Sequence, residues 1–211
     1  MPSRVIIACG ALARELRAVI ALNGWQDVRL TCLPAALHNR PEAIPARVAE
    51  LLARHVDGTA RVFVAYADCG TGGGLDRVLA AYPGVERLPG AHCYAFYAGV
   101  ERFLALADAE PGSFYLTDFL VQHFERLVID ELGLRRHPEL QALYFGNYRR
   151  VVYLAQRDAA HLREGAEVAA ARLGLPLVVI DTGYGALQPA LAGFMQPSHR
   201  VGAAGDGQWQ V

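Results

Sequence analysis

Short runs of apolar residues alternate with amphipathic segments along most of the chain. Residues 4–9 (RVIIAC) and 61–69 (RVFVAYADC) are almost unbroken apolar runs, typical of strands that are buried on both faces of a parallel sheet. Each run is followed by glycine and then by a segment with helical spacing of its apolar residues, at 11–22 and 75–82. Strands followed by helices in this way predict a parallel sheet with helical connections.

The remaining segments extend this alternation, although the middle of the chain is less regular. Further strands are predicted at 28–34, 85–89, 149–156 and 176–181, and one long helix is predicted at 117–134, with Thr117 or Asp118 as its N-cap. We therefore expect an α/β fold: a mostly parallel, doubly wound (Rossmann-like) sheet with helices on both faces. Residues 1–195 are predicted to form a single domain, and residues 196–211, which are rich in glycine and alanine, a disordered tail.

Composition and charge narrow the classes of partner. The 211 residues carry a net charge of −1, which offers no electrostatic footprint for nucleic acid or an anionic membrane. No apolar run reaches the roughly 18 residues of a membrane-spanning helix, and the first residues lead into a strand and not into a signal peptide. We expect a cytoplasmic protein that binds no nucleic acid and no membrane, and the oligomeric state is left open.

Two residue types are scarce, and their scarcity excludes several enzyme classes. All 20 basic residues are arginine, so the chain has no lysine for a Schiff base, for covalently held pyridoxal phosphate or for a P-loop. The only serines are Ser3, Ser113 and Ser198, and none lies in a G-x-S-x-G elbow, which argues against a serine hydrolase.

The four cysteines suggest a shared site. Cys9 and Cys69 each end an apolar strand and precede a glycine, and Cys93 lies in a loop before a helix. Ligands of parallel sheets bind at the carboxyl ends of the strands, so we expect Cys9, Cys69 and Cys93 to meet there as metal ligands. Cys32, inside the predicted strand 28–34, is expected to be a small buried side chain without a chemical role.

Three thiolates leave several kinds of chemistry open. They could hold a [4Fe-4S] cluster whose fourth iron stays open to a small polar substrate, or a zinc ion with one open position, with His92 as a further candidate ligand. The spacing does not discriminate zinc from iron. A metal-free alternative is a catalytic Cys69 with His92 or His38 as its base.

Polar residues and glycines around the same edge complete the predicted site. Five residues after the predicted strands are expected to bind the cofactor, because their backbone groups can come close to it. They are Gly10, Gly70, Thr71, Gly72 and Gly73. Arg40 is expected to bind an anionic part of the substrate. His38 and Tyr184 are the candidates for proton transfer.

Seven segments together carry a resemblance to a known family: IACGALARE, LHNRPE, VAYADCGTGG, GAHCY, FYLTDFLVQHF, YFGNYRRVVYLAQ and DTGYG. With them the chain resembles the uncharacterised family called domain of unknown function 1638. The resemblance implies cysteines at the positions of Cys9, Cys69 and Cys93 and an association with corrinoid-dependent methyl transfer, with a corrinoid protein as partner.

Three functions are therefore expected from the sequence. The first is a metal-dependent lyase or transferase, or an accessory protein, with a three-cysteine [4Fe-4S] cluster that meets a small-molecule substrate. The second is a zinc-thiolate protein of the methyltransferase type. The third is a carrier or chaperone that binds a corrinoid or a metal and passes it on without turnover.

Overall fold

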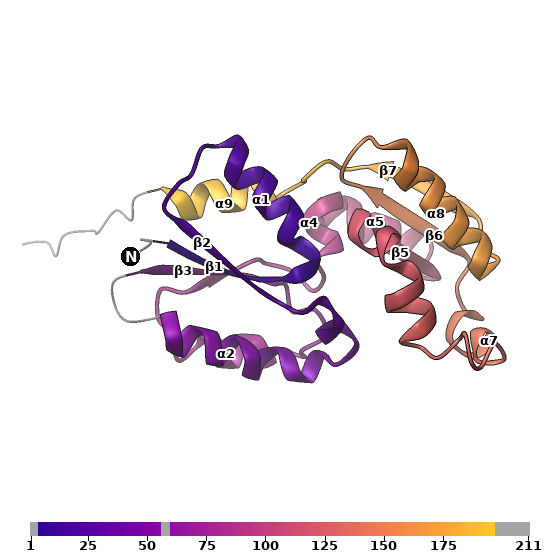
Figure 1. Cartoon of the computed structure of the whole chain (residues 1–211), viewed down its shortest axis with the longest axis horizontal. Helices are drawn as coiled ribbons and strands as arrows, with labels where there is room; N and C mark the ends of the chain where they lie inside the picture. The colour runs from indigo at the N-terminus through magenta and orange to yellow at the C-terminus, as the bar shows by residue number, and fades with distance from the viewer. Residues whose placement is uncertain (1–3, 56–59, 197–211) are drawn as a thin grey trace, which may run out of the picture.

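The computed structural model describes residues 4–55 and 60–196 as an α/β protein with two parallel sheets (Figure 1). The first sheet has the order β2-β1-β3-β4 and contains β1 (Arg4–Cys9), β2 (Val28–Leu33), β3 (Arg61–Ala65) and β4 (Glu86–Arg87). The second has the order β5-β6-β7 and contains β5 (Ser113–Thr117), β6 (Arg150–Ala155) and β7 (Leu177–Asp181). We call the two sheets, with the helices packed on them, the first and second lobes.

Helices connect the strands and cover the sheets. They are α1 (Ala13–Leu22), α2 (Ile44–His55), α3 (Gly74–Leu79), α4 (Tyr94–Ala98), α5 (Val100–Ala109), α6 (Asp118–Gln122), α7 (Leu140–Phe145), α8 (Ala160–Leu173) and α9 (Leu187–Met195). Short 3-10 turns, η1 (Gly10–Leu12), η2 (Ala35–Asn39) and η3 (Pro41–Ala43), follow β1 and β2, and a π-helix, η4 (Glu125–Asp130), follows α6.

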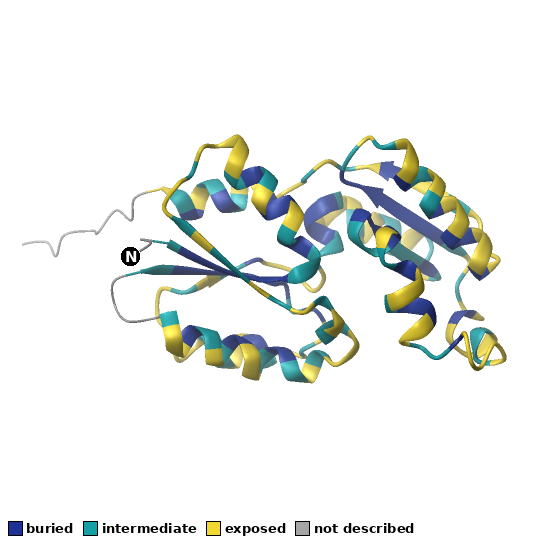
Figure 2. Ribbon diagram, in the orientation of Figure 1, coloured by how far each residue is buried: buried dark blue, intermediate teal, exposed yellow. Residues whose placement is uncertain are grey.

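The first lobe is built around β1, which lies between β2 and β3 and is buried from Val5 to Cys9. Such a strand needs apolar residues on both faces, which explains the unbroken apolar run in the sequence. In Figure 1, α1 and α9 lie on one side of this sheet and α2 on the other. Figure 2 shows that buried residues lie on the sides of these helices that face the strands.

The second lobe repeats this plan with three strands. Its central strand β6 is buried from Val151 to Ala155, and it pairs in parallel with β5 and β7. Helix α8 packs on this lobe through small residues such as Ala166 and Ala170, which are almost completely buried. Small side chains allow the helix to approach the sheet closely.

The predicted α/β class, the parallel pairing and the helices on both faces are confirmed, but the strands are divided between two sheets where the sequence suggested one. Strand β4 has only 2 residues. Such a short edge has few free backbone groups to pair with a further strand. After it, α4 and α5 intervene, and β5 begins a new sheet. The assignment of residues 1–195 to a single domain stays a prediction.

The predicted long helix at 117–134 is wrong. Residues Ser113–Thr117 form strand β5, the helix α6 ends at Gln122, and the π-helix follows. Thr117 does cap α6, because its hydroxyl accepts a hydrogen bond of 3.3 Å from the backbone N–H of Leu120. Apolar residues continue at helical spacing through both segments, so the sequence pattern alone could not show the break between them.

Helix α9, which the sequence pattern did not reveal, joins the end of the second lobe back to the first. Its side chains Leu187, Leu191 and Phe194 are buried in the core of the first lobe. The chain reaches it through Gly185, which has a positive φ of +51°. A Cβ atom at this position would collide with the backbone oxygen of Phe96 in α4, so only glycine fits here.

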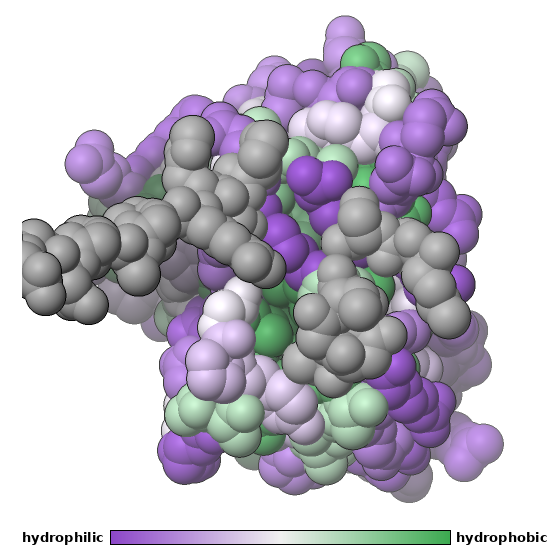
Figure 3. Space-filling view, turned by 90° about the vertical axis from the view of Figure 1, so that its left-hand side faces the viewer, coloured by the Kyte–Doolittle hydropathy of each residue, from purple (hydrophilic) through white to green (hydrophobic). Residues whose placement is uncertain are grey.

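Figure 3 looks onto the end of the first lobe at which its strands begin. The uncovered part of this face carries mostly hydrophilic residues. The carboxyl ends of the same strands point the opposite way, toward the second lobe (Figure 1). Among the described residues, no helix is long and apolar enough to cross a membrane. The tail predicted to be disordered lies, from residue 197 on, outside the described residues.

Candidate functional site

The three predicted ligand cysteines meet at the carboxyl edge of the first sheet. Strands β1 and β3 pair in parallel with Ala8 opposite Ala65, so Cys9 and the segment that leads to Cys69 leave the sheet side by side. A small inner cavity of about 10 Å³ lies between these side chains. Its lining includes Cys9, His38, Tyr66, Cys69 and Cys93.

His38 connects to this cluster from the turn that follows β2. Its Nδ1 atom lies 3.5 Å from the Sγ atom of Cys9 and 3.2 Å from the backbone oxygen of Ala35. The same sulfur accepts a hydrogen bond of 3.3 Å from the backbone N–H of Ala11, which lies in the first turn after β1. Burial alone would lower the pKa of His38, but hydrogen bonds with Cys69 and Cys9 raise it to about 11.

The surroundings of Cys69 favour its thiolate form. A hydrogen bond from Cys93 lowers the pKa of Cys69 to about 5, against the effect of burial, and the hydrogen bond and charge of His38 lower it further. The same contact raises the pKa of Cys93 well above its ordinary value, and burial adds to this. A Cys69 thiolate therefore accepts hydrogen bonds from the Cys93 thiol and the His38 imidazolium.

The backbone at Cys69 is strained. Its φ of 50° is the only positive φ at a residue other than glycine in the part of the chain that the structure describes. Left-handed backbone disfavours a residue with a Cβ atom, and such outliers occur preferentially at functional sites. Hydrogen bonds hold it in place: the N–H groups of Asp68 and Cys69 donate to the oxygens of Gly90 and Ala91, at 3.1 and 2.8 Å. These bonds also bring the loop with Cys93 to Cys69.

The glycine-rich turn after Cys69 is folded around a carboxylate of its own. Oδ1 of Asp68 accepts hydrogen bonds from the Thr71 hydroxyl and the Gly73 N–H, at 2.6 and 2.8 Å, and Oδ2 accepts one from the Gly72 N–H at 3.1 Å. The hydrogen bond from Thr71 is the main reason that the pKa of Asp68 is lowered. Thr71, Gly72 and Gly73, which were expected to bind a cofactor, donate these hydrogen bonds to Asp68, and their cofactor-binding role stays a prediction. The sequence reading missed this role of Asp68.

The other predicted residues lie at different distances from the cluster. Gly70 lines a larger outer cavity. Gly10 follows Cys9, and a Cβ atom there would lie 3.0 Å from the backbone oxygen of Leu33, so it permits close packing of β1 and β2. Arg40 is exposed and Tyr184 packs against the core of the first lobe, and neither lines a cavity at the site. Their predicted roles in substrate binding and proton transfer stay predictions.

Cys32 and His92 also differ from expectation. Cys32 is exposed on the edge strand β2 and not buried, because a residue on an edge strand is covered on fewer sides than one on a central strand. His92 lines the outer cavity but not the inner one. The imidazole that joins the cysteines is therefore that of His38.

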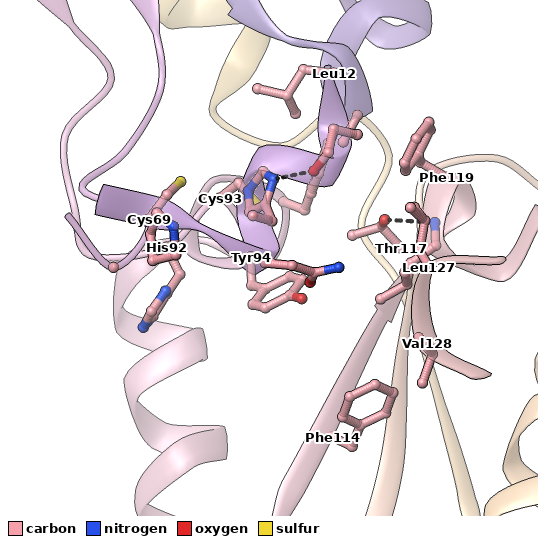
Figure 4. A pocket seen from close by; sticks show the side chains of 18 of the residues that line it. Leu12, Cys69, His92, Cys93, Tyr94, Phe114, Thr117, Phe119, Leu127 and Val128 are labelled. Carbon is pink, nitrogen blue, oxygen red and sulfur yellow. Dashed lines mark hydrogen bonds between the residues drawn. The ribbon is translucent and has the colours of Figure 1, made fainter. Parts of the chain in front are cut away.

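The outer cavity has a volume of about 410 Å³ and lies between the carboxyl edges of the two sheets. Figure 4 shows Cys69, His92, Cys93 and Tyr94 on the side of the first lobe, across from Phe114, Thr117, Phe119, Leu127 and Val128 of the second. Most of the second-lobe wall was missed in the sequence because its residues from 117 on look like the apolar face of one long helix.

Four possible metal donors, Cys9, His38, Cys69 and Cys93, lie together at this edge. Among the described residues, no group of three or more His, Cys, Asp or Glu side chains stands ready to hold a metal ion. The four donors Cys9, His38, Cys69 and Cys93 nevertheless line one small cavity. A tetrahedral zinc ion would separate a ligand sulfur and a ligand nitrogen by about 3.6 Å, and Cys9 Sγ and His38 Nδ1 are 3.5 Å apart.

A comparison with known families matches residues 32–191 to a family described as "Protein of unknown function (DUF1638)". The chain belongs to this family. The matched segment contains Cys69, Cys93 and His38 and begins after Cys9. Neither the curated proteins nor the solved structures gave a match.

Proposed function

We propose that the chain is a thiol-dependent enzyme that transfers an acyl group through a covalent intermediate on Cys69, with His38 as its proton partner. One observation carries the proposal: the Cys69 thiol contacts His38 and Cys93 at a strained backbone position and faces the outer cavity. A thiolate paired with an imidazolium is the usual form of an activated cysteine nucleophile.

The environment distinguishes Cys69 from the other two thiols of the cluster. Cys9 lines only the inner cavity and is 2% exposed, so a substrate does not reach it directly. Cys93 lines both cavities, but its raised pKa keeps it protonated, which makes it a hydrogen-bond donor to Cys69. Cys69 combines access with the thiolate form.

The proposed reaction has two steps. The Cys69 sulfur attacks a carbonyl carbon, a sulfur–carbon bond forms, and the bond to the leaving group breaks with its electron pair going to that group. The His38 imidazolium gives the leaving group a proton. In the second step, water or another acceptor loses a proton to His38 and attacks the thioester, which releases Cys69 as thiolate. Electrons and protons balance over the cycle without an oxidant or a reductant.

The rate of Cys69 alkylation as a function of pH tests this proposal. We expect iodoacetamide to modify Cys69 with a midpoint near pH 5, since its pKa is lowered to about 5 and only the thiolate reacts. The control is Cys32, an exposed residue whose thiol is nevertheless partly shielded from water. This partial desolvation, together with Cys9, raises its pKa, so it should react only at alkaline pH. Peptide mass spectrometry assigns the sites. If Cys69 titrates at or above the pH range of Cys32, the proposal is wrong.

A second candidate function is a metal-thiolate centre, favoured by the four donors around the inner cavity. Its volume of about 10 Å³ is about that of one water molecule or ion, which suits a single zinc ion better than a cluster of four irons and four sulfides. Cys9, His38, Cys69 and Cys93 would hold the ion. It would supply an activated thiolate, as in the zinc-thiolate methyltransferase type predicted from the sequence.

Metal analysis separates the two candidates. Protein purified without oxygen is analysed for zinc, iron and sulfide, and Cys69 is then alkylated with and without a chelator. The metal-thiolate centre predicts one zinc per chain and faster alkylation after chelation, because a bound thiolate is protected. The metal-free enzyme predicts no stoichiometric metal and no effect of the chelator. Iron with equimolar sulfide would support the [4Fe-4S] cluster, which stays a prediction.

The corrinoid protein as partner and the carrier function also stay predictions. A carrier of a corrinoid or a metal requires stoichiometric binding without turnover. Titration of the protein with a corrinoid, followed by its absorption spectrum, tests the binding directly. Turnover of an acyl substrate by the same preparation would contradict a carrier that has no catalytic activity.

A further inference from the structure

The outer cavity differs from the predicted binding site for a small polar substrate. Among the described residues that line it, none has the side chain of aspartate, glutamate or arginine, and the chain contains no lysine. Apart from Thr117 and the tyrosines, the polar side chains of the lining come from the loops of the first lobe. They are His38, Asn39, Cys69, His92 and Cys93. The one ion pair in the lining, His38 with Cys69, is already satisfied internally, so a charged ligand would lose its hydration here without gaining an unpaired ionic partner.

The wall of the second lobe is apolar. Its side chains come from β5, α6, the π-helix and the turn that follows; they are Phe114, Phe119, Leu120, Leu127, Val128 and Leu132. The π-helix itself contributes Leu127 and Val128, and π-helical segments often occur at functional sites. Figure 4 shows Leu127, Val128 and Phe114 on the side of the cavity opposite Cys69 and His92.

Aromatic contacts behind the lining hold both walls in position. The ring of Phe114 packs edge-on against Phe145 and Tyr148, with centroid distances of 5.3 and 5.5 Å. Across the cavity, Tyr94 stacks on Tyr115 at 5.5 Å. Rings locked by such neighbours lose little further freedom when a ligand binds, so the cavity is preformed for an apolar molecule.

We propose that this cavity binds an uncharged molecule with an extended apolar part, aliphatic or aromatic, whose reactive end lies at Cys69. The placement of the reactive end rests on the proposed function, whereas the apolar specificity follows from the cavity alone. The volume of about 410 Å³ falls in the range of ~300–1,000 Å³ that is typical of small-molecule sites. The apolar part lies against the second lobe, and the carbonyl carbon lies beside the thiolate.

A series of N-substituted maleimides tests the specificity through the reaction with Cys69. Maleimides add to a thiolate without a leaving group, and the chain on nitrogen can be lengthened from methyl to hexyl. In a Cys32→Ser background we expect the rate at Cys69, divided by the rate with glutathione, to rise about 10-fold or more along the series. A flat series with a fast N-methyl reaction would overturn the apolar specificity and leave the reactive thiol intact.

Binding without reaction gives an independent test. N-hexylsuccinimide has the same chain but no double bond, so its binding, measured by calorimetry, does not depend on Cys69 chemistry. We expect the wild type to bind it and Leu127→Asn and Leu120→Asn to bind it at least about 5-fold more weakly. The control Leu143→Asn changes an α7 side chain that is 73% exposed and should bind like the wild type. Circular dichroism establishes that each variant is folded.

The two measurements keep the two proposals separate. An unreactive Cys69 together with binding of the succinimide would reject the nucleophile and retain the apolar cavity. Equal binding by wild type, Leu127→Asn and Leu120→Asn, or no binding by the wild type, would reject the apolar cavity whatever the reactivity of Cys69.

Discussion

The carboxyl edges of the two sheets face the same cavity, yet they carry different chemistry. The first edge holds three thiols and an imidazole that hydrogen-bond mainly to one another and line the cavities. The second edge holds Asp118, directly after β5 and only 1% exposed. Both edges bury ionisable groups, so burial alone does not distinguish a reactive group from a structural one.

The partners of Asp118 explain the difference. Its carboxylate accepts hydrogen bonds from the Tyr153 hydroxyl at 2.7 Å, the Gln156 N–H at 3.0 Å and Arg157 Nε at 2.9 Å. Its own N–H donates to the Gln156 side chain at 2.7 Å. A carboxylate so fully bonded joins β5 to β6 and is not available to a ligand. Cys69, by contrast, lines the outer cavity.

The largest expected effect concerns the first edge. Replacing His38 by Gln removes the imidazolium that stabilises the Cys69 thiolate, so the midpoint of Cys69 alkylation should move to higher pH. We expect the pKa of Cys69 to rise by about two units, which would lower the thiolate fraction, and with it the alkylation rate at pH 6, about 10-fold. The control is His123→Gln in the second lobe, where the ring packs on Phe119. An unchanged midpoint in His38→Gln would show that the imidazole does not activate the thiol.

The next effect concerns the second edge. Asp118→Asn removes the charge that pairs with Arg157 and one acceptor of the network, and we expect it to lower the free energy of unfolding by about 3 kcal/mol. Urea denaturation measures the loss. Asp158→Asn, whose side chain is 93% exposed beside Arg163, should leave the stability nearly unchanged. Equal effects of the two substitutions would contradict a structural role for the second edge.

A substitution of Glu15 on α1 is expected to change the free energy of unfolding less than Asp118→Asn does, and in the opposite direction. It is 2% exposed, its Oε2 atom has no hydrogen-bond partner, and burial raises its pKa. A carboxyl with a raised pKa binds its proton more tightly in the folded state. Its ionisation therefore costs stability as pH rises through the folded pKa.

We expect Glu15→Gln to stabilise the protein by about 1 kcal/mol at neutral pH and to leave it unchanged below the unfolded pKa of Glu15. Urea denaturation as a function of pH measures both limits. The exposed Glu167 of α8 provides the matched Glu→Gln control. Destabilisation at neutral pH would mean that the Glu15 carboxylate is paired and favourable.

The smallest effect is expected at the turn after β3. The lowered pKa of Asp68 means that its carboxylate adds stability above the unfolded pKa, and this contribution is lost as pH falls through the folded pKa. Because the side chain is partly exposed, Asp68→Asn should cost only about 0.5 kcal/mol at pH 7. Thermal unfolding at pH 7 and pH 3 measures the difference. A larger loss at pH 3 than at pH 7 would contradict the assigned sign.

Several features of the fold were predictable from the sequence because they depend on local pattern. The unbroken apolar runs at β1, β3 and β6 reflect burial on both faces. The threonine at the start of α6 reflects local geometry, because its hydroxyl accepts a hydrogen bond from the nearby N–H of Leu120. Strand β5 (SFYLT) was missed because polar residues interrupt its apolar run and α6 follows it directly. Helix α9 was missed because nine residues carry little periodic signal.

The convergence of Cys9, Cys69 and Cys93 was predicted from the sequence, because parallel strands place their carboxyl ends on one edge. The tertiary structure alone decided which imidazole joins them and which thiol becomes the thiolate, since these depend on contacts between segments far apart in the chain. It also decided that Asp68 occupies the glycine-rich turn and that the second lobe closes the cavity with apolar side chains. Residue types and strand order specify which groups are present at the edge. Their protonation and access depend on distance and burial, which only the folded chain sets.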